Sequence, residues 1–322
     1  MLFIIIPILF LSIFIFVELN CENLFDCRHD SLKNDTEFLS DGSYHWTRSR
    51  YWRKLNRVGQ TIISCGEKKG GNAAGNPWQL PDLVALCEVE NDSVMHDLTR
   101  RSLLRKARYE YIMTSSPDER GIDVALMYSP FTFSLLSQRQ IGIRLVEGMR
   151  PTRNLLYAEG RVASGDTLHV VVAHLPSRRG GEAQSRPFRR QVATQIRELV
   201  DSVREAKPNA NIIVTGDFND YSSSESVRIV CSAGMADISS SATGSNGARG
   251  TYRYQGEWGS LDHIVVSLPM LPKVVGCRVN DAPFLLVKDD KYGGVQPRRN
   301  YLGPRYLDGF SDHLPLVAEF CF

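Results

Sequence analysis

The sequence predicts a single α/β domain, and three observations support that prediction. The chain has 322 residues, of which 43% are apolar and 23% charged, so it can bury a large core. Short apolar runs rich in strand-forming residues alternate with segments of helical periodicity. No linker or internal repeat interrupts this alternation. A net charge of +2 excludes a global field that would hold a polyanion, so any anion binding must be local.

The predicted strands are short runs dominated by Ile, Val, Leu and Phe, and most of them end in polar residues of catalytic type. In chain order they are Ile13 to Asn20, Leu83 to Glu88, Val124 to Tyr128, Leu168 to His174, Ile212 to Asp217, Ile264 to Ser267 and Leu316 to Phe320.

Two helices are predicted between these strands. Leu55, Val58 and Ile62 recur at helical spacing in the first. The second has apolar residues at Phe188, Val192, Ile196, Leu199 and Val203, opens at Ser185 and Pro187, and ends before Pro208. Three further stretches, 66–80, 239–250 and 288–309, are predicted to be loops at the rim of a site. For the first two, a surface insertion is an equal alternative.

The N-terminus allows two interpretations. Residues 1–17 are apolar apart from Pro7 and Ser12, which is typical of a secretory leader or anchor, but no Lys or Arg precedes Arg28. We expect Ile13 to Leu19 to form a buried first strand. A leader or anchor would then be confined to residues 1–12, with one folded domain at 13–322. The protein would be exported or membrane-associated if residues 1–12 serve in that way, and cytoplasmic otherwise.

The seven cysteines are an odd number, widely spaced and without a CxxC motif. They predict free thiols that fill apolar space, and they offer no ligand pairs for zinc.

The polar residues at the strand ends share one chemistry. They are Asn20, Glu22, Glu88, His174, Asp217, Asn219, Asp262, Asp312 and His313. Carboxylate and amide oxygens are hard ligands that suit Mg²⁺ or Mn²⁺. In Val214-Thr-Gly-Asp217-Phe-Asn219, a buried run leads into a turn that presents a carboxylate and an amide above the sheet.

These motifs, in their order along the chain, resemble those of the endonuclease/exonuclease/phosphatase superfamily. They are Asn20-Cys-Glu22-Asn23-Leu-Phe, Leu86-Cys-Glu88-Val-Glu-Asn, Gly121-Ile-Asp-Val-Ala-Leu-Met-Tyr128, Ala173-His174-Leu-Pro-Ser-Arg-Arg-Gly-Gly, Gly216-Asp217-Phe-Asn219, Ser260-Leu-Asp262-His263 and Ser311-Asp312-His313. The superfamily includes pancreatic-type deoxyribonucleases, abasic-site endonucleases, neutral sphingomyelinases and inositol polyphosphate 5-phosphatases. The resemblance extends from about residue 13 to the end of the chain.

The resemblance implies a four-layer α/β sandwich, with two mixed β-sheets packed face to face and helices outside, and a Mg²⁺-dependent phosphoester hydrolase. By position, Glu88 is implied as the main metal ligand, supported by Asn20, Glu22 and Asp312. His313 is implied as the catalytic histidine, oriented by Asp262. Asp217 and Asn219 occupy positions that orient water or the leaving group and hold the phosphate, and His174 occupies a second phosphate-contacting position.

A phosphodiester in nucleic acid is the first substrate prediction. It depends on a local basic patch, Arg178, Arg179, Arg186, Arg189 and Arg190, in which Arg178 would contact a substrate phosphate. Alternatively, these arginines lie on the solvent-exposed first turns of the helix that contains Phe188 and Val203 and bind no phosphate. Trp46, Tyr51 and Trp52 interleave with cations and would serve either as a stacking surface or as core packing.

Two alternatives remain. A phospholipid, sphingomyelin or inositol-phosphate hydrolase is favoured if the N-terminus contacts a membrane. An inactive binding module is the alternative of another class, and the intact set of site residues argues against it. A monomer is the expected state.

Overall fold

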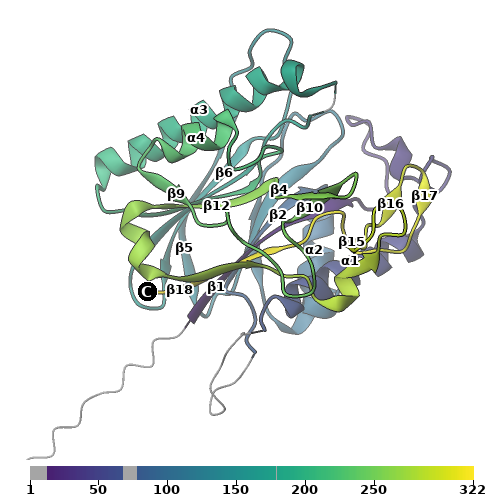
Figure 1. Ribbon diagram of the computed structural model, residues 1–322, viewed down its shortest axis with the longest axis horizontal. Coiled ribbons are helices and arrows are strands. Elements are labelled where there is room, and N and C mark those ends of the chain that lie inside the picture. Colours follow the sequence, from purple (N-terminus) through teal and green to yellow (C-terminus); the bar gives the residue numbers. More distant parts are fainter. Residues whose placement is uncertain (1–12, 68–77, 179) are drawn as a thin grey trace, which may run out of the picture.

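A computed structural model describes residues 13–67, 78–178 and 180–322. In this part of the chain, two six-stranded mixed sheets pack face to face, as the sequence predicts (Figure 1). Sheet 1 contains, in spatial order, β13 (Val274–Val279), β18 (Leu316–Cys321), β1 (Ile13–Leu24), β2 (Leu83–Val89), β4 (Asp123–Tyr128) and β3 (Glu110–Met113). Sheet 2 contains β5 (Phe133–Ile141), β6 (Leu155–Val162), β7 (Thr167–His174), β8 (Asn211–Asp217), β12 (Asp262–Ser267) and β9 (Met235–Asp237).

Helices cover the outer face of each sheet. The helices α1 (Arg48–Ser64) and α2 (Asp92–Arg100) pack on sheet 1, and α3 (Glu182–Ala206) and α4 (Glu225–Cys231) pack on sheet 2. Figure 1 shows the two helical layers on opposite sides of the molecule. The four-layer α/β sandwich is therefore confirmed.

The alternation of side chains in β1 explains how sheet 1 is held on both faces. Phe14 and Phe16 point into the core between the sheets, whereas Ile15, Val17 and Leu19 point toward α1 and α2. A strand buried on both faces reads as a continuous apolar run, because successive side chains point to opposite sides. This is why the sequence could predict the strand but not its two faces.

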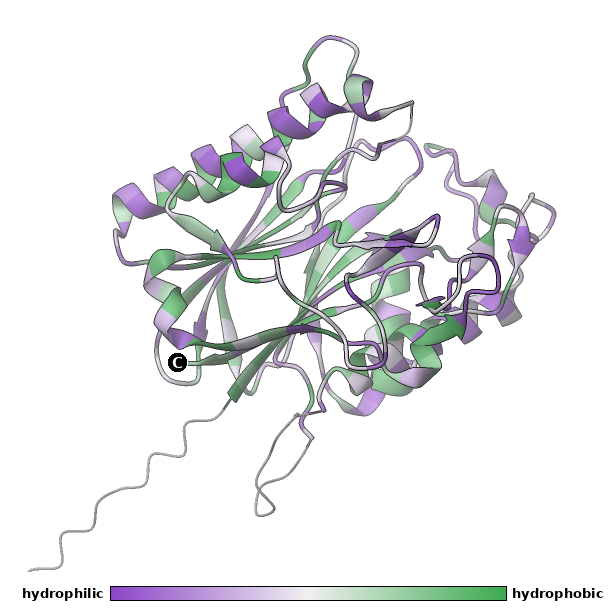
Figure 2. Cartoon of the chain, viewed as in Figure 1, coloured by the Kyte–Doolittle hydropathy of each residue, from purple (hydrophilic) through white to green (hydrophobic). Residues whose placement is uncertain are grey.

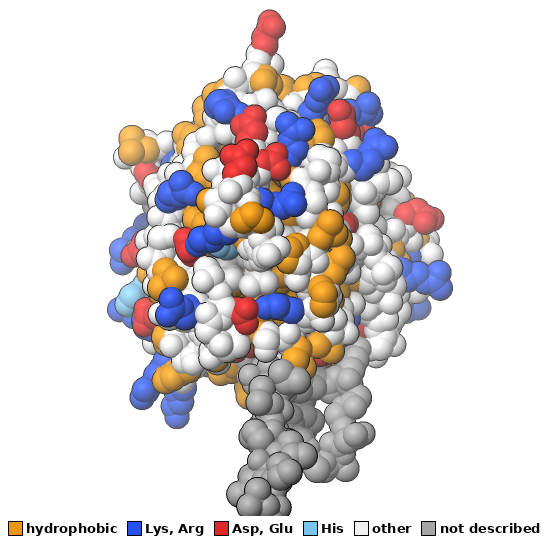
Figure 3. All heavy atoms as spheres, turned by 90° about the vertical axis from the view of Figure 1, so that its left-hand side faces the viewer, with side chains coloured by type: hydrophobic (Ala, Val, Ile, Leu, Met, Phe, Trp, Pro, Cys, Tyr) orange, Lys and Arg blue, Asp and Glu red, His pale blue; other side chains and the backbone are white. Residues whose placement is uncertain are grey.

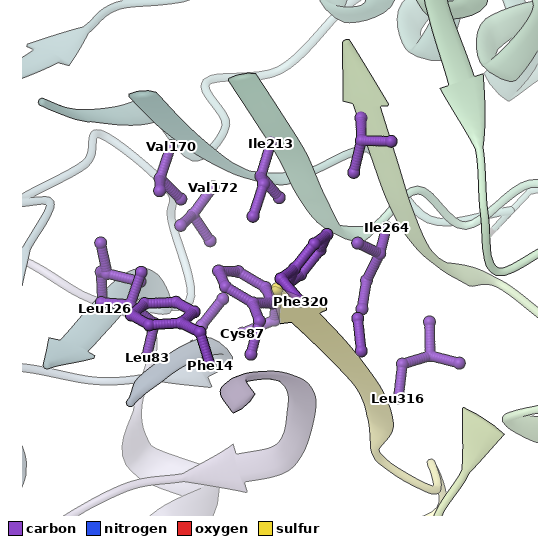
Figure 4. Close-up of a cluster of buried hydrophobic side chains, with 14 of the residues drawn as sticks. Phe14, Leu83, Cys87, Leu126, Val170, Val172, Ile213, Ile264, Leu316 and Phe320 are labelled. Carbon is purple, nitrogen blue, oxygen red and sulfur yellow. The ribbon is translucent and has the colours of Figure 1, made fainter. Parts of the chain in front are cut away.

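Apolar side chains from both sheets meet in the central core. Figure 4 shows Leu83 and Phe14 of sheet 1 near Val170 and Val172 of sheet 2. Figure 2 shows apolar residues concentrated along the strands, while α3 carries hydrophilic and hydrophobic residues in alternation. Burying such side chains contributes roughly 1.5–3 kcal/mol each to folding, so the sheet interface stabilises the fold together with the two layers of helix–sheet packing.

Two pairs of parallel neighbours decide where the polar strand ends meet. The strands β1 and β2 are parallel, as are β7 and β8, whereas β12 runs antiparallel to β8. Parallel strands end at the same edge of a sheet, and β12 begins at that edge because it runs the other way. The ends that carry Asn20, Glu88, His174 and Asp217 and the start that carries Asp262 therefore share one edge of the sandwich.

The sequence did not predict strands β3, β5, β6, β9 and β13 or helices α2 and α4, and three further details differ from the expected elements. Helix α3 begins at Glu182, so Ser185 and Pro187 lie inside its first turns and do not precede it. The stretch 288–309 contains the short strands β15 (Val295–Pro297), β16 (Tyr301–Leu302) and β17 (Arg305–Tyr306). Further short elements are β10 (Tyr252–Tyr254), β11 (Glu257–Gly259), β14 (Leu286–Lys288) and the 3₁₀ turns Thr36–Phe38, Leu103–Lys106, Leu268–Lys273 and Pro283–Leu285.

The first strand begins at Ile13, which confirms the buried-strand reading. The leader or anchor predicted at 1–12 lies outside the described residues. Within the described part of the chain, no helix has both the length and the apolar character needed to cross a membrane. All seven cysteines are free thiols, as expected. On the face drawn in Figure 3, Lys and Arg side chains are interspersed with Asp and Glu, in keeping with the small net charge.

Candidate active site

Three neighbouring strands of sheet 2 present polar side chains at the shared edge. His174 of β7 pairs with Asp217 of β8 in parallel register, and Asp217 pairs with Asp262 of β12 in antiparallel register. All three side chains are almost completely buried. Strand pairing thus places two carboxylates and an imidazole side by side.

Sheet 1 contributes Asn20 and Glu88, and its backbone is distorted where they lie. The register between β1 and β2 shifts between Asn20 and Leu24, and Glu22 and Glu88 adopt φ values of 50° and 60°. Positive φ is uncommon for residues other than glycine, and its strain is found mainly at functional sites. Bulges of this kind turn a side chain away from the direction that simple alternation would give it.

The bulge decides where Glu88 points. In β2, Leu86 faces the helices and Cys87 faces sheet 2, so simple alternation would direct Glu88 toward the helices. Instead Glu88 Oε2 accepts a 2.9 Å hydrogen bond from the Asn23 amide, and Oε1 lies 4.0 Å from His174 Nε2. Glu88 therefore reaches across to the second sheet.

His313 lies in the segment that precedes β18 and is paired with Asp262. Nδ1 of His313 lies 2.8 Å from Asp262 Oδ2, and both side chains are buried. The hydroxyl of Thr251 donates a hydrogen bond to the same carboxylate oxygen, and the Ser311 hydroxyl accepts from the His313 amide at 3.1 Å. This arrangement fixes the orientation of the imidazole and leaves Nε2 free for proton exchange.

Asp217 is the residue where the two sheets meet. Its Oδ2 accepts a 3.0 Å hydrogen bond from Asn20 Nδ2 and lies 3.6 Å from His174 Nε2. Its Oδ1 accepts the Asn219 amide at 2.7 Å, which fixes the turn after β8. The Asn219 side chain is directed by its own hydrogen bond to the Leu175 carbonyl, 3.0 Å long.

Glu22 and Asp312 form a second group beside the first. The backbone amides of Asn300 and Tyr301 donate to the two oxygens of Glu22, at 2.6 and 3.0 Å. Arg299 lies 2.9 Å from Asp312 and 4.0 Å from Glu22. The Asn20 side chain joins this group to the first, because its Oδ1 accepts the Glu22 amide at 2.9 Å.

Burial and mutual repulsion change the proton affinities in the site. Burial raises the pKa of Glu22 to about 7, and Asp312 adds to the rise. Burial, followed by repulsion from Asp262, raises the pKa of Asp217 to about 7. Burial lowers the pKa of His174. At His313 burial also lowers the pKa, but Asp262, Asp217 and Asp312 together outweigh it and leave that pKa well above its usual value. The carboxylates therefore carry more negative charge than their protein surroundings neutralise.

This charge imbalance fits a divalent cation. One ligand atom each from Asp217, Asp262 and His313 lies within 4.8 Å of the others. The fully buried carboxyl group of Glu18 adjoins this cluster, and burial, followed by repulsion from Asp262, raises its pKa well above the usual value. Carboxyl groups crowded together in a buried place are typical of a cation site. The ligands implied by the sequence, Asn20, Glu22, Glu88 and Asp312, line the adjoining part of the same edge.

The predicted basic patch is largely occupied by internal ion pairs. Arg189 is fully buried and pairs with Glu182 at 2.7 Å and with Asp220 at 2.9 Å. Arg178 donates to the Asn219 carbonyl and to Asp220, both at 2.9 Å. Arg186 and Arg190 pair with Glu182 and Glu225, and Arg179 lies outside the described residues. The idea of a freely solvated basic patch is wrong for Arg189, while the phosphate contact of Arg178 stays a prediction.

The aromatic residues near the start of α1 serve mainly as packing. Trp46 and Tyr51 are buried in the core beneath the helices, and the Trp46 indole donates to the Phe25 carbonyl at 2.9 Å. Only Trp52 among them remains half-buried. A stacking surface built from all three is therefore excluded.

Sequence reasoning missed five residues around the site: Glu18, Lys54, Arg120, Thr251 and Arg299. Arg120 lies 3.8 Å from Glu88, and Arg299 lies between Glu22 and Asp312. Arg299 lies in the stretch 288–309, which was predicted as a loop at the rim of a site, but no periodicity singles out one residue within such a loop. Lys54 left a signal, because it interrupts the apolar stripe of the helix that contains Leu55 and Val58.

A model of the endonuclease/exonuclease/phosphatase family matches residues 15–321 of the chain. In a comparison with curated protein sequences, none matches this chain. Among solved structures, an endonuclease/exonuclease/phosphatase family protein of Bacteroides thetaiotaomicron is 16% identical with a TM-score of 0.60, covering 97% of this chain and 98% of its own.

Two further structures are similar at the same level. A mannosyl-6-phosphatase of B. thetaiotaomicron is 16% identical with a TM-score of 0.61, covering 96% of this chain and 100% of its own. D. rerio TDP2, complexed with a single-strand DNA product, is 17% identical with a TM-score of 0.54. The similarity covers 96% of this chain and 99% of the TDP2 chain. At such identities these structures establish a shared fold.

Proposed function

The chain belongs to the endonuclease/exonuclease/phosphatase family, and on this premise we propose that it hydrolyses phosphoester bonds with a divalent metal ion. The observation that carries the proposal is the buried Asp262–His313 pair, which lies beside Asp217 at one edge of the sandwich. Phosphoester hydrolysis needs the phosphoryl charge neutralised, a water activated and the leaving oxygen stabilised. The residues gathered at this edge can meet each need.

His313 is proposed as the catalytic histidine. Because the imidazole Nδ1 forms the hydrogen bond with Asp262, Nε2 is the nitrogen that would exchange a proton with water or bind a phosphoryl oxygen. Asp217 would orient the attacking water or the leaving group, since Asn20 and the Asn219 amide hold its carboxylate in place.

Asn219, His174 and Arg178 are proposed to contact the substrate phosphate. The Asn219 side chain is oriented by the Leu175 carbonyl, and His174 is held between Glu88 and Asp217. Arg178 donates to the Asn219 carbonyl and to Asp220, so it would reach a substrate phosphate by leaving Asp220.

Glu88, with Asn20, Glu22 and Asp312, is proposed to hold the metal ion, and Mg²⁺ is the first choice with Mn²⁺ as the alternative. These are oxygen ligands, which hard divalent cations prefer. A divalent cation at this position would supply positive charge that neutralises the phosphoryl oxygens.

For the substrate, we propose a phosphodiester in nucleic acid. The support is the similarity of fold to TDP2, a structure complexed with a single-strand DNA product. The internal ion pairs of Arg178, Arg186, Arg189 and Arg190 favour a second candidate, a small phosphorylated sugar. Such a substrate needs no run of free cations for flanking phosphates, and the similar mannosyl-6-phosphatase has this kind of substrate in its name.

A substrate panel tests the proposal. Purified protein is assayed with Mg²⁺, with Mn²⁺ and with excess chelator on plasmid, abasic duplex, RNA, sugar phosphates, sphingomyelin and inositol polyphosphates. His313→Ala is the control for contaminating activity. We expect metal-dependent cleavage that His313→Ala loses. Cleavage of sugar phosphates alone would replace the nucleic-acid proposal, and no cleavage of any substrate would favour a binding module.

A further inference from the structure

An aromatic surface adjoins His313 on the hairpin that β10 and β11 form. Tyr252 of β10 makes a backbone bridge to His313, and the ring centroids of the two residues are 4.9 Å apart. Tyr254 lies two residues further along the same strand and is 61% exposed. Alternate residues of a strand point to the same face, so Tyr254 extends the face on which Tyr252 meets the imidazole.

The length of this surface favours a ligand with more than one ring. Two residues along a strand span about 7 Å, and an aromatic ring lies at each end of that span. A small sugar phosphate held at His313 would meet Tyr252 and leave Tyr254 uncovered. Successive bases of a single nucleic-acid strand can stack on both tyrosines.

A hollow of about 430 Å³ borders the same hairpin, and this volume is typical of ligand pockets. Its lining includes Tyr221, Arg249, Gly259 and Ser260. Gly259 is the partner of Tyr252 in the hairpin, and an added Cβ there would lie 2.4 Å from a ring carbon of Tyr221. The hollow therefore begins directly beside the aromatic surface.

Two arginines bring positive charge to this hollow. The guanidinium group of Arg178 lies 4.5 Å from the centre of the Tyr221 ring. Arg249 is exposed, and within residues 13–67, 78–178 and 180–322 it has no ion-pair partner. Proteins that bind single-stranded nucleic acid combine cations for the phosphates with aromatic side chains for the bases. Both parts are present beside His313.

We propose that this hairpin surface binds the bases of a single-stranded nucleic acid next to the scissile phosphate. Tyr252 and Tyr254 stack on successive bases, and Arg249 contacts a phosphate of the backbone. The inference rests on the proposed nucleic-acid substrate and specifies its form. A single strand is required because bases paired within a duplex are not free to stack on a protein ring.

Fluorescence anisotropy with two short labelled probes of equal length tests the inference, in excess chelator so that metal-dependent cleavage is prevented. One probe is oligothymidylate, and the other is a sugar-phosphate strand without bases. The wild type should bind oligothymidylate roughly fivefold or more tightly, because stacked bases add affinity. Tyr254→Ala should lose most of this preference. Tyr254→Phe keeps the ring and should retain it.

Phe131→Ala is the matched control. Phe131 is 70% exposed and follows β4, which ends on the side of the sandwich away from the site. This variant should bind both probes as the wild type does. Arg249→Gln should weaken the binding of both probes by the same factor, about twofold or more, since it removes a charge and no ring.

An equal preference for bases in Tyr254→Ala and wild type overturns the inference. So does a wild type that binds both probes equally, a result that needs no variant to fold. A wild type that prefers oligothymidylate but cleaves no nucleic acid with Mg²⁺ or Mn²⁺ refutes the proposed function and supports the binding surface. Cleavage of nucleic acid without any preference for bases in binding refutes the surface alone.

Discussion

The side-chain amide of Asn20 donates a 3.0 Å hydrogen bond to the carboxylate of Asp217, and this bond joins the two sheets at the edge that carries the site. Asn20 lies in β1 of sheet 1 and Asp217 at the end of β8 in sheet 2. Both are almost completely buried. The geometry of the site therefore depends on how the two sheets are docked.

Asn20→Ala should lower activity and stability together. Removing the amide leaves the buried Asp217 carboxylate without this donor, which costs about 1–3 kcal/mol. Urea unfolding measures the loss of stability, and steady-state kinetics on any cleaved substrate measures the loss of turnover. Asn154→Ala, at a largely exposed amide, is the control. Equal midpoints for Asn20→Ala and wild type would show that this hydrogen bond does not stabilise the docked sheets.

His313→Ala should lower turnover by roughly 10²–10⁴-fold without unfolding the chain, because it removes the proton-exchanging group. Asp262→Asn should also lower turnover while the imidazole remains, since the amide no longer holds Nδ1 in the same way. The kcat of each variant is compared with that of His96→Ala, whose imidazole is half exposed on α2. Wild-type activity in His313→Ala would remove this residue from the mechanism.

Glu88→Gln should raise the Mg²⁺ or Mn²⁺ concentration needed for half-maximal activity, because the amide lacks the charge that binds the metal. Calorimetric titration of Mn²⁺ gives the same comparison without substrate. Glu110→Gln, on β3 in a pair with Arg100, is the matched control. An unchanged metal requirement in Glu88→Gln would place the cation elsewhere, for instance at Asp217, Asp262 and His313.

Gly216→Ala should destabilise the protein by about 3 kcal/mol or more. Gly216 has a φ of 131°, and an added Cβ would lie 1.9 Å from the Ala173 carbonyl oxygen of the neighbouring strand. Gly276→Ala in β13, where a Cβ meets nothing within 4 Å, should change stability by less than about 1 kcal/mol. Urea midpoints that rank the two variants in the opposite order would contradict this account.

The buried imidazole of His169 should make stability fall as the pH drops below about 6.5. Burial lowers the pKa of His169, whose Nδ1 lies 2.8 Å from the Tyr157 hydroxyl. Below the ordinary value the unfolded chain binds the proton while the folded chain does not, so unfolding gains free energy from proton uptake.

Comparison of urea midpoints at pH 7.5 and pH 5.5 checks this prediction for wild type and His169→Gln. The variant should lose less stability between the two pH values. His96→Gln, at an exposed imidazole, should follow the wild type. Parallel pH dependence in wild type and His169→Gln would exclude His169 as the cause.

Much of the fold was predictable because the sequence shows both apolar runs that form strands and apolar residues at helical spacing. The runs that end at Asn20, His174 and Asp217 are all strands, and the stripe of Leu55, Val58 and Ile62 lies on a helix. The division of these strands between two sheets came only from the resemblance, because a buried apolar run does not reveal its partners.

The meeting of polar residues at one edge was predictable where a short motif joins them to a strand end, as at Asp217 and His313, and their catalytic roles stay predictions. It was not predictable where position depends on the fold of a distant loop. Arg299 shows this, because it meets Asp312 only after the 288–309 stretch folds back over the strand ends. Arg178 and Arg189 are a second example, because their ion-pair partners Glu182 and Asp220 come close to them only in the folded protein.

One further consequence follows from the position of β1 inside sheet 1. Ile13 pairs with Cys321, so the neighbour of β1 on one side is synthesised nearly a whole chain later. During translation, β1 can pair with β2 while its other edge stays open, and His313 has not yet been made. Long-range pairings of this kind slow folding and leave strand edges prone to wrong association. Sheet 1 and the site at its edge can therefore be completed only after the final strand has been made.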